Sequence, residues 1–337
     1  MRNEFARATL ADRDRRIATI ACASVLVAAL GAVYLPVLLF TFGPILLGVA
    51  HVAADVRYLV LRRKLARWWQ SSIWVGCAAL IALRVAEELG WLRQIDRVEF
   101  GFAAALIAAA VLAGLRERGS AARAVAAGAL LAVATGCALT QPRIARYVFL
   151  HAHNLIAILA WATLFRANKR WLLAPLALIV STAVALASGA MYEQTLASPF
   201  AASFHLHVFT VSDWLAPFAD PRLAIGVTTT YLFLQSVHYS AWLNWIPQQE
   251  QPKRGTPTFR MSMRSLFTDL GAPGVAAVGL AALAVWVGAC FDLHRTQRLY
   301  LSLATFHGYL ELAVLAFFWV GGSGPAEQEQ AVHSEAA

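Results

Sequence analysis

Runs of about 20 mainly apolar residues recur along the whole chain, and each is long enough to cross the hydrocarbon core of a bilayer as a helix. Hydrophobic residues make up 59% of the 337 residues and charged residues only 14%, which is typical of an integral membrane protein. The sequence therefore predicts an all-α, polytopic membrane bundle of about ten transmembrane helices. The predicted spans cover residues 17–38, 41–61, 68–86, 99–115, 124–141, 147–165, 171–192, 223–245, 272–291 and 299–320.

The lysines and arginines are divided unevenly between the two sides of this predicted bundle. If the N-terminus is cytoplasmic, 19 of the 28 lie in cytoplasmic segments and seven on the opposite side, while Arg57 and Arg84 fall within spans. Membrane proteins carry such an excess of positive charge in their cytoplasmic loops. We therefore expect both termini in the cytoplasm, and we expect the membrane to be the bacterial inner (cytoplasmic) membrane.

The net charge of +9 does not indicate a nucleic-acid partner, because the cations are spread over many loops and form no single basic patch. Residues 1–322 are expected to form one integral membrane domain, and the polar residues 323–337 are expected to be a disordered tail. Membrane lipids are the expected surroundings, and the sequence leaves protein partners and the oligomeric state open.

Four of the histidines within the predicted spans are candidates for a site: His51, His153, His238 and His307. A charged side chain at mid-bilayer costs roughly 2.5–3.5 kcal/mol, so ionisable residues at this depth indicate a functional site. Asp55 follows His51 by four residues, and residues four apart project from nearly the same face of a helix. Glu311 follows His307 at the same spacing. We interpret the histidines as metal ligands and the two carboxylates as catalytic groups, further ligands or groups that orient the imidazoles. The alternative is that each pair only ties helices together.

The positions of these histidines along their spans refine the interpretation. His151 and His153 are two residues apart and cannot face one site from a regular helix, so we take the deeper His153 as the ligand. His151 is then an interfacial residue or a proton relay. Counting residues from the outer surface places His238 roughly 10 Å deeper than the other three candidates. Either His238 is part of a substrate tunnel and not a metal ligand, or the predicted boundary of its span is misplaced. Gly308 is expected to allow a close helix approach beside His307.

Two further groups of polar residues lie near the predicted outer surface. His205 and His207 on an extended stretch would point to one side as a ligand pair, or they belong to an amphipathic stretch at headgroup level. Arg84, Glu87 and Glu88, at the end of the third span, predict an ion pair at the outer boundary. His294 and His333 lie in polar segments and are expected to be solvated.

Imidazoles and carboxylates, without cysteine or methionine ligands, favour Fe(II) in a non-haem site, and zinc uses similar ligands. Haem b is the alternative cofactor, because histidines on facing helices can bind it axially.

Four short segments resemble a known family. GVAHVAAD at 48–55 is similar to a G-L-P-H-G-x-x-D segment, without its proline and second glycine, of the Brp/Blh family of integral membrane dioxygenases. These enzymes cleave β-carotene to retinal with non-haem iron. HAHN at 151–154, SVHYSAW at 236–242 and TFHGYLE at 305–311 resemble later histidine segments of that family, although no histidine follows His238 by four residues. The resemblance implies iron ligation by His51, His153, His238 and His307.

Three functions of different classes fit these features. We favour a membrane-embedded non-haem iron dioxygenase that acts with O2 on an apolar lipid or carotenoid-like substrate. A haem-binding electron-transfer or quinol-oxidising subunit would need two axial histidines. A proton-coupled transporter would use the histidine–carboxylate pairs as relays and would need no metal.

Overall fold

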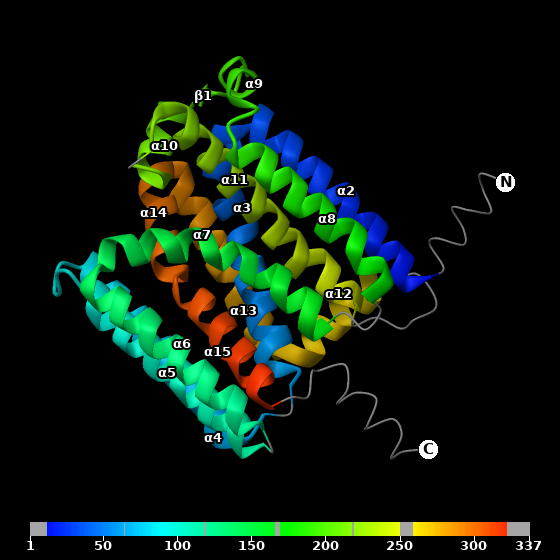
Figure 1. Ribbon diagram of the computed structural model, residues 1–337, viewed down its shortest axis with the longest axis vertical. Coiled ribbons are helices and arrows are strands. Elements are labelled where there is room, and N and C mark those ends of the chain that lie inside the picture. The colour runs from blue at the N-terminus through cyan, green and yellow to red at the C-terminus, as the bar shows by residue number, and fades with distance from the viewer. Residues whose placement is uncertain are drawn as a thin grey trace. The chain divides into compact units, whose positions relative to one another are not determined.

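A computed structural model of the chain describes residues 12–63, 65–117, 119–165, 169–217, 219–249 and 259–321 (Figure 1). The predicted polar tail and His333 lie outside these residues. The described residues are helical throughout, apart from turns and a hairpin of two two-residue strands. The predicted class, a polytopic helical membrane protein, is thereby confirmed.

Eight helical segments are long and apolar enough to cross a membrane, judged over the described residues by length and composition. They are α2 (Arg13–Tyr34), α3 with η1 (Pro36–Val56 and Arg57–Leu61), α4 (Arg67–Glu88), α5 (Asp96–Arg116), α6 (Ala121–Thr140), α7 with η2 (Pro142–Ala160 and Trp161–Phe165), α13 (Phe259–Phe291) and α14 with α15 (Leu293–Ala304 and Phe306–Gly321).

The other two of the ten predicted spans also coincide with helices. They are not among the eight because one is shorter and the other is more polar than a typical membrane-spanning helix. The seventh corresponds to α8 (Lys169–Ala187), in which the apolar stretch Trp171–Ala187 is shorter than the rest. The eighth corresponds to α11 (Pro221–Ser240) and η3 (Ala241–Trp245). Buried polar side chains such as Thr228 and Gln235 make α11 less apolar than a typical lipid-facing span.

The chain divides into two compact units, and the first comprises Met1–His51 and Arg166–His294. Within it, α2, α8 and α11 pack against one another (Figure 1). Gly226 makes the contact between α11 and α8 possible, because a Cβ atom there would lie 2.9 Å from the carbonyl oxygen of Ala187. The same unit contains α9 (Tyr192–Leu196), β1 (Ala202–Ser203), β2 (Leu206–His207), α10 (Val208–Leu215) and α12 (Ile246–Gln249).

The second unit comprises Val52–Phe165 and Arg295–Ala337, and α15 packs there against α4, α5, α6 and α7. Arg84 on α4 binds Glu87 at 2.7 Å, which confirms the predicted ion pair. Arg84 also pairs with Glu99 of α5, a partner that sequence reasoning missed. Both Arg84 and Glu99 are buried, so this pair joins two spanning helices inside the unit.

The helices that carry the candidate histidines share an irregularity. After His51, α3 continues as the π-helical turn η1; after His153, α7 continues as η2; and after His238, α11 continues as η3. The helix of His307 is separated from α14 by Thr305. Single π-helical turns within α-helices frequently mark functional sites. This backbone pattern therefore points to the same residues as the histidines themselves.

Candidate metal site

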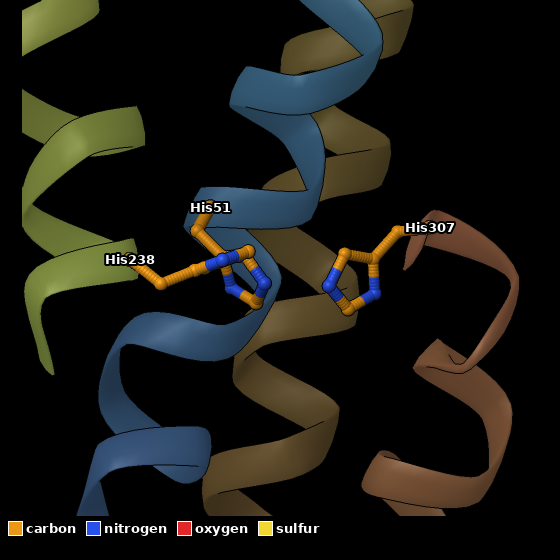
Figure 2. A group of neighbouring side chains, drawn as sticks. All are labelled: His51, His238 and His307. Atoms are coloured by element: carbon orange, nitrogen blue, oxygen red, sulfur yellow. The ribbon is translucent and has the colours of Figure 1, made fainter. Parts of the chain in front are cut away.

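Three of the four predicted ligands come together in one buried group. The ligand nitrogens of His51, His238 and His307 lie within 4.8 Å of one another, and Figure 2 shows the three imidazoles. Their exposed fractions are 2%, 0% and 6%. The residues come from α3, α11 and α15, which are far apart in the sequence. This helical membrane protein therefore contains a group of three histidines that could hold a metal ion.

His51 and His238 lie at the same level within the first unit. Their ring centroids are 5.3 Å apart, and the ring of Tyr239 lies 4.6 Å from that of His51. The depth estimate that placed His238 roughly 10 Å below the other histidines is therefore wrong. It took the second span to begin at residue 41, whereas α3 begins at Pro36. His51 and His238 therefore lie at nearly equal distances along their helices, 15 and 17 residues after the first residues of α3 and α11.

Backbone hydrogen bonds fix which nitrogen of two imidazoles is available. Nδ1 of His51 lies 3.4 Å from the carbonyl oxygen of Leu47, and Nδ1 of His307 contacts the carbonyl oxygen of Ala304. A carbonyl oxygen only accepts hydrogen bonds, so Nδ1 is the donor and Nε2 keeps its lone pair. Metal-bound histidines typically have such a partner on the second ring nitrogen, which fixes the tautomer and orients the ring.

His153 lies beside this group but does not belong to it. Within the second unit its ring centroid is 5.5 Å from that of His307, and its Nδ1 lies 2.9 Å from the carbonyl oxygen of Leu150. Gly308 makes this approach possible, because a Cβ atom there would lie 2.7 Å from Cζ of Phe149. The predicted close approach at Gly308 is confirmed. Ligation by His153 stays a prediction.

The two predicted carboxylates are buried on the same helices as two of the histidines. Asp55 and Glu311 each follow a histidine by one turn, a rise of about 6 Å, and they interact electrostatically with each other. Asp55 is 0% exposed, and neither carboxylate oxygen has a hydrogen-bond partner among the described residues. A buried carboxylate in that state needs a nearby cation or a proton. A divalent ion on three neutral imidazoles would supply the cation, so this residue set fits a metal.

Several polar residues near these positions were not predicted as site residues. Asn154, next to His153, is completely buried, and its amide has no hydrogen-bond partner within the described part of the chain. The buried Tyr300 hydroxyl also has none there, and it interacts electrostatically with Asp55. Asn154 could have been identified from the sequence, because it is a polar residue inside a predicted span. Tyr239 and Tyr300 could not, because tyrosine is common near both ends of transmembrane helices.

The histidines of the outer segment have structural roles. Phe204 and His205 form the tight turn between β1 and β2, both with positive φ, so the expected extended H-x-H stretch is absent at these residues. Nδ1 of His207 accepts a hydrogen bond from the backbone N–H of Phe209 at 3.2 Å and thereby caps α10. Nε2 of His294, expected to be solvated, lies 2.9 Å from the carbonyl oxygen of Phe204.

No protein-family model, no curated protein and no solved structure matches the chain. The function must therefore be inferred from the site and from the sequence segments that contain it.

Proposed function

We propose that the protein is a membrane-embedded non-haem iron dioxygenase that acts with O2 on an apolar lipid or carotenoid-like substrate. His51, His238 and His307 would hold the Fe(II), and the bacterial cytoplasmic membrane would supply the substrate. The observation that carries this proposal is the group of three buried histidine side chains. The resemblance of four histidine segments to the Brp/Blh family supports iron as the metal and a polyene as the substrate.

The number of converging imidazoles favours non-haem iron over haem. A haem iron takes one or two axial protein ligands, whereas three ligand nitrogens lie within 4.8 Å of one another in this group. Non-haem iron oxygenases hold the metal with a small set of histidine and carboxylate ligands and leave other coordination positions open. The described residues match that pattern more closely than an axial pair.

The side chains of the site have separate roles in this proposal. Bound iron would supply the activation of O2. His51 and His307, each fixed through Nδ1 by a backbone carbonyl, would hold their Nε2 atoms in place without reorganisation. The buried carboxylates of Asp55 and Glu311 would balance the charge of the ion and can hold a proton near it. Burial of all these groups would keep water from the reacting atoms.

The test combines metal content with product analysis. The protein is reconstituted in nanodiscs with Fe(II), β-carotene and O2, and retinal is measured by chromatography. We expect retinal formation that His51→Ala and His307→Ala both abolish, together with loss of bound iron. His151→Ala is the matched control, because His151 is on the same helix as His153 and is outside the group of three histidines, and it should keep both.

Other outcomes would assign the protein to another class. A Soret band that disappears in the histidine variants would indicate haem. A metal-free protein whose pH-dependent transport fails in Asp55→Asn or Glu311→Gln would indicate a proton-coupled transporter. Iron binding without carotenoid cleavage would keep the metal site and overturn the polyene as substrate.

A further inference from the structure

A cavity of about 690 Å³ lies in the second unit, between α5, α6, α7 and α15. Its size is within the range of pockets that hold small organic ligands. The lining is apolar apart from Thr163 and Arg123, and the Thr163 hydroxyl already donates a hydrogen bond of 2.6 Å to the carbonyl oxygen of Leu159. The walls therefore suit a hydrocarbon chain, and among the described residues Arg123 is the one charged group on them.

The cavity opens on a lipid-facing side of these helices. Leu130 and Leu159 are 66% and 54% exposed, although both line the cavity and both belong to spanning helices. The cavity exists because three of its lining residues, Ala127, Ala134 and Ala316, have small side chains, and larger side chains at these positions would fill it. A ligand would therefore enter from the bilayer.

Arg123 gives one end of the cavity the chemistry of an anion site. It lies in the first turn of α6, where the helix dipole favours negative charge. Its Nη1 donates to the carbonyl oxygen of Trp319 at 3.1 Å, and the rest of the guanidinium has no further partner among the described residues. The charge distribution of the sequence places this end of α6 at the cytoplasmic surface, where anionic lipid headgroups are found.

We propose that this cavity binds one anionic membrane lipid, with an acyl chain between α5, α6, α7 and α15 and its phosphate on Arg123. An arginine fork matches two phosphate oxygens, so the headgroup would be held by charge-assisted hydrogen bonds. This lipid site is separate from the histidine group, and the proposal does not depend on bound iron.

The test is native mass spectrometry of the detergent-purified protein after exchange with phosphatidylglycerol or zwitterionic phosphatidylcholine. We expect one phosphatidylglycerol to bind in preference to phosphatidylcholine, and Arg123→Gln to lower the affinity for phosphatidylglycerol about tenfold. Ala134→Trp, which fills the cavity from an exposed position, should weaken the binding of both lipids. Arg116→Gln is the matched control, because Arg116 is an exposed arginine over the ring of Trp68 and does not line the cavity.

Three results would overturn the lipid site: equal binding of both lipids, equal effects of Arg116→Gln and Arg123→Gln, or wild-type protein that retains no lipid. Metal content is measured in the same samples and should not change in these variants. Failure of the lipid proposal is thereby distinguished from failure of the metal site.

Discussion

At the scale of single residues, Arg84 and Glu99 form a buried ion pair between α4 and α5. Arg84→Gln would leave the carboxylate of Glu99 buried without its cation, which typically costs about 3–5 kcal/mol. We expect a loss of unfolding free energy of this size, measured by denaturation in detergent. Arg146→Gln is the control, because Arg146 pairs with Asp96 from a side chain that is 49% exposed, and such pairs contribute about 0–1 kcal/mol. Equal losses of unfolding free energy in the two variants would show that the buried pair contributes no more to stability than the exposed pair.

Asp55 tests the charge balance of the candidate metal site. Removing its negative charge in Asp55→Asn should lower the affinity for Fe(II) by about 10–100-fold, as loss of groups that support metal ligands does. Titration of the apo-protein with Fe(II) measures this affinity. Glu99→Gln is the comparison, because Glu99 is an equally buried carboxylate that already has Arg84 as its cation. An unchanged affinity for Fe(II) in Asp55→Asn would show that the charge of Asp55 does not contribute to metal binding.

Residue chemistry alone identified much of the candidate site. His51, His238 and His307 were predictable because polar groups inside an apolar run are costly and need a reason. Their convergence was not predictable, because hydropathy shows that a helix crosses the membrane and does not show which helices meet. Tyr239 and Tyr300 were missed for the same reason: their importance depends only on what lies beside them.

At the scale of helices, glycine determines how closely α5 and α15 approach. A Cβ atom at Gly114 would lie 2.5 Å from the carbonyl oxygen of Phe317, and a backbone atom cannot move aside as a side chain can. We expect Gly114→Ala to destabilise the protein by about 1–3 kcal/mol in thermal or chemical unfolding. Gly101→Ala on the same helix should be neutral or stabilising, since no other group of the described residues lies within 4 Å of a Cβ atom at that position. Equal effects would contradict the close packing of α5 on α15.

The sequence predicted where helices occur more accurately than how they are built. All ten predicted spans coincide with helices, because a segment buried in lipid must satisfy its own backbone hydrogen bonds. The π-helical turns η1, η2 and η3 were not predicted, because a change from one hydrogen-bond register to another leaves the hydropathy pattern unaltered. The depth of His238 was wrong for a related reason, since residue counts measure distance along a helix and not where it starts.

At the scale of the complete bundle, the distribution of positive charges predicts the orientation in the membrane. Arg93 is exposed before α5 and Arg116 is exposed at its end, on opposite predicted sides of the membrane. In a background with the native cysteines replaced, Arg93→Cys should react with a membrane-impermeant maleimide in intact cells. Arg116→Cys should react only after permeabilisation. The reverse pattern would invert the proposed topology.

If His51, His238 and His307 bind one metal ion, metal analysis of the purified protein by mass spectrometry, with an optical spectrum of the same sample, will detect it. We expect about one iron per chain without a Soret band, lost in His238→Ala and retained in His151→Ala. A colourless, metal-free protein that also fails to bind added Fe(II) would contradict it.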